Sequence, residues 1–187
     1  MFNKKIFVSG GGGYIGTRLI QKLVEKKFSV ICFDRFSKGI DWYKDIFDES
    51  VKIIKGDIRT IDKKDIVNAE VVIDLSAKSK NTEGSEKNDT IEINQTGRQR
   101  LASISKKIGV KKYIRISGTS VYGQQNNIVD ENSKVNPVTE YSKSNYYAER
   151  DVLKLNSTDF SVVILRFPSV FGFSPNMRWD QAINSMI

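Results

Sequence analysis

Short, almost continuous apolar runs recur along the chain and alternate with longer stretches of helical periodicity. The runs lie at residues 6–8, 28–33, 51–54, 71–75, 113–116 and 160–165. A strand covered on one face alternates apolar and polar residues, whereas a strand buried on both faces is apolar throughout. Helical patterns connect the runs, at 15–26, 90–107 and 141–155. This alternation predicts an α/β fold, a doubly wound parallel sheet with helices on both faces.

The composition indicates one soluble domain with a single core. The chain has 187 residues, of which 39% are hydrophobic and 28% charged. No apolar stretch is long enough to span a membrane, and residues 6–8 are too short for the apolar part of a signal peptide, so we expect a cytoplasmic protein. The single cysteine, Cys32, lies in an apolar run and is expected in the core, which suits a reducing compartment.

The charged and polar residues exclude several classes of function. The chain has no histidine, which argues against a Ser-His-Asp triad and a zinc site, so we expect no metal and assign acid–base chemistry to tyrosine, lysine or carboxylates. The net charge of +8 comes from lysines scattered in short pairs, such as Lys26 and Lys27. No nucleic-acid recognition motif accompanies them, so we expect a solvated surface that suits a phosphate-bearing small ligand and no nucleic-acid partner.

A glycine-rich bend joins the first predicted strand to the first predicted helix. It contains Gly11-x-Gly13-x-x-Gly16, and Gly10 also permits the reading Gly10-x-x-Gly13-x-x-Gly16. In such a bend the first glycine allows the tight turn, the middle one lets backbone N–H groups approach a pyrophosphate, and the last lets the helix pack closely on the strand. The motif in this context predicts a dinucleotide-binding site.

An acidic residue ends the second predicted strand at the distance that such a site requires. Asp34 follows Gly16 by 18 residues and is placed to accept hydrogen bonds from the hydroxyls of the adenosine ribose. A carboxylate there repels a 2′-phosphate, which favours NAD over NADP. Arg35 beside it could attract that phosphate, so the sequence leaves NADP as the less favoured cofactor.

With these motifs in place, residues 8–16 resemble the opening of the extended short-chain dehydrogenase/reductases, in particular the NAD-dependent sugar-nucleotide epimerases and dehydratases related to UDP-glucose 4-epimerase. The likeness continues in order along the chain, at residues 56–59, 72–77, 94–97, 120–123, 136–141 and 165–178. The resemblance implies a Rossmann-type NAD-binding domain over residues 1–172. Residues 173–187 would begin a smaller substrate-binding region that is otherwise largely absent.

The resemblance also assigns site residues. With Arg35 added, the implied cofactor-binding positions are Gly10, Gly13, Tyr14, Ile15, Gly16, Asp34, Arg35, Asp57, Ile58, Leu75, Ala77, Asn94, Tyr141 and Pro168. Ser169 and Arg178 would contact the substrate. Structural alternatives stay open at three positions: Asp57 as a helix cap, Asn94 as a buried bridge and Pro168 as a loop residue.

The catalytic residues depart from the family pattern, which combines a tyrosine, a lysine four residues later and a serine or threonine. Tyr141 is present, but Asn145 stands at the lysine position and Gly118 at the hydroxyl position. A free tyrosine has a pKa of about 10, which a neighbouring cation lowers. Lys143 is a poor substitute, because at about 100° per residue it points away from Tyr141 along a helix. Thr119, Ser120 or Ser117 could supply the hydroxyl from an adjacent position.

These departures leave two functions open. The first is an NAD-dependent sugar-nucleotide epimerase or dehydratase, or a truncated relative, in which NAD takes a hydride from a sugar carbon and Tyr141 removes the hydroxyl proton. The second is a catalytically silent NAD-binding module that acts as a redox sensor or assembly subunit, which Gly118 and Asn145 favour.

Two further features bear on assembly. The helices at 90–107 and 141–155 resemble those through which the family often pairs, so a homodimer is expected. Residues 179–187 have the pattern of an amphipathic helix that stops without a cap.

Overall fold

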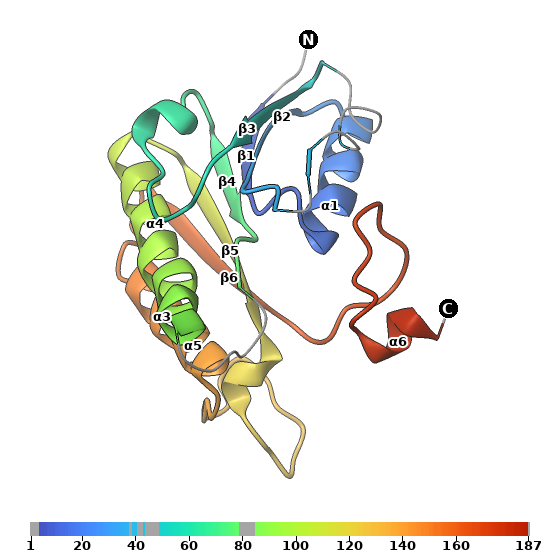
Figure 1. Ribbon diagram of the computed structural model, residues 1–187. Helices are drawn as coiled ribbons and strands as arrows, with labels where there is room; N and C mark the ends of the chain where they lie inside the picture. The colour runs from blue at the N-terminus through green and yellow to red at the C-terminus, as the bar shows by residue number, and fades with distance from the viewer. Residues whose placement is uncertain (1–3, 38, 41–42, 44–48, 79–84, 187) are drawn as a thin grey trace.

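A computed structural model describes residues 4–37, 39–40, 43, 49–78 and 85–186. Its centre is a six-stranded sheet in the order β3-β2-β1-β4-β5-β6, and every neighbouring pair is parallel (Figure 1). The strands are β1 (Lys5–Ser9), β2 (Ser29–Asp34), β3 (Val51–Lys55), β4 (Val71–Asp74), β5 (Lys112–Gly118) and β6 (Ser161–Phe167). All six predicted strands are confirmed, and so is the doubly wound parallel sheet.

Helices cover the two faces of this sheet. Helix α1 (Tyr14–Glu25) lies on one face, and α3 (Ser85–Ile91), α4 (Arg98–Lys107) and α5 (Glu140–Leu153) lie on the other (Figure 1). A π-helical segment, Glu92–Gly97, joins α3 to α4. Two short 3₁₀ turns, Lys63–Asp65 and Thr119–Tyr122, precede β4 and follow β5. The second predicted helix therefore begins at Ser85 rather than at residue 90.

The core consists of two apolar clusters, one on each face of the sheet. On β1, Phe7 packs with the cluster beneath α4 and α5, whereas Ile6 and Val8 pack with the cluster beneath α1. Successive side chains of a strand point to opposite faces, so burial on both sides requires an apolar run without alternation. Cys32 is fully buried in the α1 cluster, as predicted for a core residue.

The strand order reverses direction between β1 and β4. From β1 the chain passes outward to β2 and β3, and it then returns to add β4, β5 and β6 on the other side. In open parallel sheets a ligand binds outside the carboxyl ends of the strands at such a switch point, because the connecting loops diverge there and leave a crevice. The glycine-rich bend leaves β1 at this place.

The prediction for the end of the chain is wrong over most of its length. Only α6 (Ala182–Ser185) is helical, residues 179–181 form turns, and residue 187 lies outside the described residues. Helices this short gain little from their own hydrogen bonds and need a packed apolar face. Ile183 and Met186 remain largely exposed, so that support is weak. Among the described residues, no helix has the length and apolar character needed to cross a membrane.

Replacing Gly16 with alanine is expected to destabilise the fold. In an open helix the change from glycine to alanine stabilises by about 0.5–1 kcal/mol. Here an added Cβ would lie 2.7 Å from the Cα of Gly11, so the helix has to move off the bend and we expect a loss of about 1–3 kcal/mol. Urea unfolding measures the difference, with the exposed Arg18→Ala on the same helix as control. Stabilisation by Gly16→Ala would contradict the close packing.

Candidate dinucleotide-binding site

A cavity of about 800 Å³ opens at the carboxyl ends of the strands, where the strand order reverses. Most of the positions predicted for a cofactor line it. They are Gly10, Gly13, Tyr14, Ile15, Gly16, Asp34, Arg35, Asp57, Ile58, Leu75, Ala77, Tyr141 and Pro168. The predicted substrate residue Arg178 lines it as well. Segments far apart in the sequence thus meet around one space, which is large enough for an extended small molecule.

The glycine-rich bend forms one wall of the cavity. Gly10 has a φ of +72°, and a Cβ there would lie 2.7 Å from the backbone carbon of Leu75, so only glycine fits between the bend and β4. Gly13 is the N-cap of α1 and offers no side chain, and no acidic residue follows in the first turn. The first amides of a helix have no intrahelical acceptors. They face a cavity here, which is an arrangement suited to a diphosphate.

Asp34 at the end of β2 lies directly across the bend. One of its carboxylate oxygens accepts a hydrogen bond from the amide of Gly12 at 3.1 Å, and the other accepts one from the amide of Phe36 at 2.8 Å. Burial raises the pKa of Asp34, while these two amide hydrogen bonds act in the opposite direction. The carboxylate is therefore held in a fixed orientation beside the cavity, with further lone pairs for hydroxyl donors.

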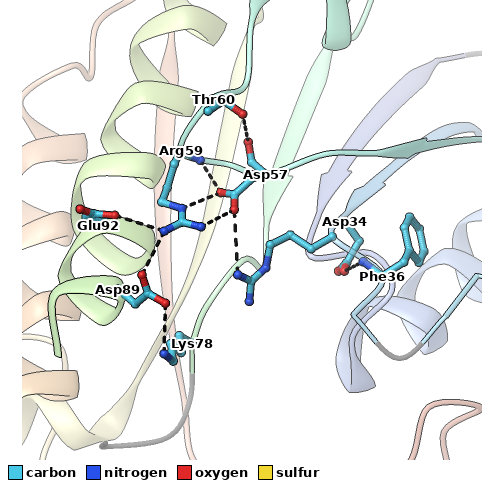
Figure 2. Close-up of polar contacts among 9 residues, drawn as sticks. Asp34, Phe36, Asp57, Arg59, Thr60, Lys78, Asp89 and Glu92 are labelled. Atoms are coloured by element: carbon cyan, nitrogen blue, oxygen red, sulfur yellow. Dashed lines mark hydrogen bonds and ion pairs between the residues drawn. The ribbon is translucent and has the colours of Figure 1, made fainter. Parts of the chain in front are cut away.

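A chain of ion pairs extends from Asp57, which lines the cavity, to residues outside the lining (Figure 2). Arg59 donates to both carboxylate oxygens of Asp57, at 3.0 and 2.7 Å, and it also contacts Asp89 and Glu92. These hydrogen bonds from Arg59 lower the pKa of Asp57. Arg35 approaches the same carboxylate at 3.9 Å. Asp57 also accepts from the backbone amide of Arg59, so it caps a turn while it lines the cavity.

Four predicted site residues lie outside the lining of the cavity. Asn94 is fully buried and bridges the backbone of Lys78, donating to its carbonyl and accepting from its amide. Thr119 and Ser120 are exposed in the 3₁₀ turn after β5, and Ser169 is exposed after β6. Ser117 on β5 does line the cavity, and its buried Oγ has no hydrogen-bond partner among the described residues.

Tyr141 sits at the first turn of α5, at the far end of the cavity from Asp34. Four residues on, Asn145 is buried and donates from Nδ2 to the carbonyl of Tyr141 at 3.0 Å. Gly118, at the end of β5, also lines the cavity. The charged residue Arg178 lies near Tyr141. Its guanidinium donates two hydrogen bonds, at 3.2 and 2.8 Å, to the carboxylate of Asp180.

The sequence reasoning missed Arg98, a buried residue of α4 that lines the cavity. An arginine in a predicted helix gives no sign of such a role by itself, because most helical arginines face solvent. The spacing did contain a signal, since Asn94, Arg98, Leu101 and Ser105 share one helix face and all four are buried. Arg98 therefore belongs to the polar interior behind the site.

The segment after β6 closes one side of the bend. The hydroxyl of Tyr14 donates to the carbonyl of Gly172 at 2.6 Å, and the hydroxyls of Thr17 and Ser174 lie 2.8 Å apart. Asn176 donates to the carbonyl of Gly12 at 2.6 Å. These contacts hold residues 172–176 against the glycine-rich bend and the start of α1.

The parallel sheet, the glycine bend and the acidic residue at the end of β2 define a Rossmann-type dinucleotide-binding protein. Residues 6–187 match the model of the NAD dependent epimerase/dehydratase family, and the chain belongs to that family. The prediction made from its motifs is confirmed.

Individual relatives agree with this assignment. A putative UDP-glucose 4-epimerase of Methanocaldococcus jannaschii is 32% identical over 97% of this chain, and UDP-glucose 4-epimerase of Bacillus subtilis is 25% identical over 97%. The crystal structure of UDP-glucuronic acid 4-epimerase from Bacillus cereus in complex with NAD superposes with a TM-score of 0.84, at 27% identity over 96% of this chain. The chain spans 61%, 57% and 61% of these three proteins, respectively.

Replacing Asp57 with asparagine is expected to lower stability at neutral pH and to have little effect in acid. Because Arg59 lowers the pKa of Asp57 in the fold, the ion pair stabilises above the ordinary carboxyl pKa of about 4 and is lost as the pH falls through the lowered value. We expect Asp57→Asn to cost about 1 kcal/mol at pH 7.

Urea unfolding of both proteins at neutral and at strongly acidic pH measures this dependence. The exposed Glu131→Gln serves as the control for a lost negative charge. A deficit of Asp57→Asn that is equally large at both pH values would show that the ion pair is not its cause.

Proposed function

We propose that this chain binds NAD in the cavity and forms the cofactor-binding part of a nucleotide-sugar epimerase or dehydratase. The observation that carries the proposal is one cavity that joins an uncapped helix N-terminus, an oriented carboxylate and a tyrosine. The residues present fit a dinucleotide, because the four consecutive glycines at 10–13 carry no side chains that would fill the space beside the helix amides. We place the boundary between this part and the substrate-binding region after residue 172.

In this proposal the cofactor lies across the carboxyl ends of the strands. The amides that begin α1 bind the pyrophosphate, Asp34 binds the adenosine ribose, and Asp57 and Ile58 border the adenine. Arg35 already faces the carboxylate of Asp57, which supports NAD rather than NADP as the preferred cofactor. Leu75, Ala77 and Pro168 line the remaining groove.

Tyr141 is the proposed general base. NAD supplies a reversible acceptor for hydride from a sugar carbon. Tyr141 lines the same cavity and takes the proton of the sugar hydroxyl. Ser117 is better placed than Thr119 or Ser120 to orient that hydroxyl, because its buried Oγ lacks a partner and the other two are exposed.

The proposed substrate is a nucleotide sugar. Homologous structures include complexes with UDP-glucuronic acid and UDP-glucose. Arg178 lines the cavity close to Tyr141 and can contact an anionic part of such a ligand, and Ser169 lies beside Pro168 at its edge.

Pairing of two copies through α4 and α5, and a cytoplasmic location, stay predictions. A silent NAD-binding module is the second candidate, favoured by Gly118 and Asn145 in the tyrosine's surroundings.

Replacing Asp34 with asparagine should weaken NAD binding by about tenfold to a hundredfold. The change removes the charge that accepts hydrogen bonds from the ribose hydroxyls, and charge-assisted hydrogen bonds are about twice as strong as neutral ones. Isothermal titration calorimetry with NAD and NADP measures the effect, and Glu131→Gln controls for net charge. The preference for NAD over NADP should narrow in the same variant. Unchanged NAD affinity would remove Asp34 from the site.

Replacing Tyr141 with phenylalanine separates the two candidate functions. For an epimerase we expect turnover of UDP-glucose or UDP-glucuronic acid, measured in a longer protein that carries a complete substrate-binding region, to fall about a hundredfold or more, while NAD affinity changes less than about threefold. Tyr146→Phe, one turn further along α5, is the control and should keep full turnover. A wild-type protein that carries this region and binds NAD but converts neither sugar nucleotide would favour the silent module.

A further inference from the structure

Two arginine side chains are buried side by side behind Tyr141. Arg98 projects from α4 and Arg115 from β5, and they are 1% and 0% exposed. Both donate hydrogen bonds to one atom, the side-chain oxygen of Asn145, at 3.3 and 3.1 Å. Asn145 therefore joins two guanidinium groups through its oxygen and the backbone of Tyr141 through its nitrogen.

The charges of this cluster do not cancel. Asp74 is fully buried and pairs with Arg98 at 2.7 Å, and its oxygens also accept from the hydroxyls of Ser9 and Tyr113. Among the described residues no carboxylate lies within ion-pair distance of Arg115, and its Nε and Nη1 have no hydrogen-bond partner. Two guanidinium groups and one carboxylate leave one net positive charge in the interior.

The nearest other carboxylate does not neutralise this charge. Glu149 on α5 is engaged by Arg166, which donates to both of its oxygens at 3.3 and 2.7 Å. Burial, and then the charge of Arg98, lower the pKa of Arg115 to about 9, so the group still carries its proton at neutral pH. Arg178, which also lines the cavity, is paired with Asp180 at 2.8 Å.

A buried charge with unpaired donors is costly for a fold, and replacing it with an apolar group of similar size is often stabilising. Arg115 alone is thus a liability for stability. Its position suggests a different use, since Arg98, Ser117 and Gly118 around it line the cavity together with Tyr141.

We propose that the Arg98–Arg115 pair supplies the positive charge of this site from behind Tyr141, and that Asn145 is the positioning residue that holds the two guanidinium groups together. The functional half of this inference rests on the proposed binding of NAD. The proposal also explains why asparagine replaces the family's lysine at position 145. A lysine there could accept no hydrogen bond from either guanidinium group and would add a third cation.

The stability of four proteins tests the arrangement without any ligand. The set comprises the wild-type chain, Asn145→Lys, Arg115→Met and the double variant. We expect Asn145→Lys to lower the melting temperature strongly, Arg115→Met to preserve or raise it, and the double variant to recover most of the loss, since it again holds one excess charge. A loss from Asn145→Lys that is equally large with and without Arg115 would overturn the proposed arrangement.

Dinucleotide binding tests what the charge does. A positive charge near the nicotinamide disfavours the cationic ring of NAD⁺ relative to the neutral ring of NADH. At neutral pH, Arg115→Met should therefore shift the ratio of the NADH and NAD⁺ affinities by about threefold to tenfold toward NAD⁺. Arg115→Lys keeps the positive charge and should leave this affinity ratio unchanged. The double variant, Asn145→Lys with Arg115→Met, should return the ratio to the wild-type value. A purely structural role for Arg115 predicts no change of the ratio, and that result would overturn the functional half.

Failure of the proposed function looks different in these measurements. If the wild-type chain binds neither NADH nor NAD⁺, the proposed function is wrong and with it the functional half. The four melting temperatures use no ligand, so they still decide whether Asn145 and Arg115 are coupled.

Discussion

The contact between the glycine bend and its two neighbours is the constraint on which the site depends. Gly10 lies against the backbone of Leu75 on the β4 side, and Gly16 lies against Gly11, so neither position has room for a side chain. This packing fixes the start of α1 at the point where the strand order reverses. It also brings the amide of Gly12 within hydrogen-bond distance of Asp34. The helix amides and the carboxylate are therefore placed by one backbone arrangement.

The electrostatic groups around the cavity divide along its length. At one end the partial positive charge of a helix N-terminus lies beside the Asp34 carboxylate, and together they suit a phosphate followed by a sugar diol. At the other end Tyr141 lies in front of buried guanidinium groups. An extended ligand with an anionic middle and a redox-active far end matches this division. The family to which the chain belongs uses such a ligand, NAD.

The sheet and the phosphate bend were predictable because they rest on local signals. Runs such as 28–33 are apolar because both faces of the strand are covered. The motif spacing also identifies Gly16 as the glycine at which the helix packs closely against the bend. The surroundings of Tyr141 were not predictable in this way. Arg98 and Arg115 lie 17 positions apart in sequence and meet only because β5 pairs beside β4, beneath α4. The short end helix also escaped prediction, since periodicity does not show whether an apolar face is covered.

Position 145 shows why a departure from a motif cannot be judged one residue at a time. Taken alone, asparagine in place of lysine removes a cation and indicates a site that has lost its chemistry. In the fold, the same asparagine accepts from two nearby guanidinium groups, and within the described part of the chain it is the one residue that both of them contact by hydrogen bonds. The two guanidinium groups and the carboxylate of Asp74 then leave one net positive charge in the interior. A single lysine in neutral surroundings would supply the same charge. The asparagine at position 145 and the two arginines, Arg98 and Arg115, therefore belong to one arrangement. A lysine at position 145 together with both arginines would raise the net charge above one unit, and an asparagine there without the arginines would leave no positive charge.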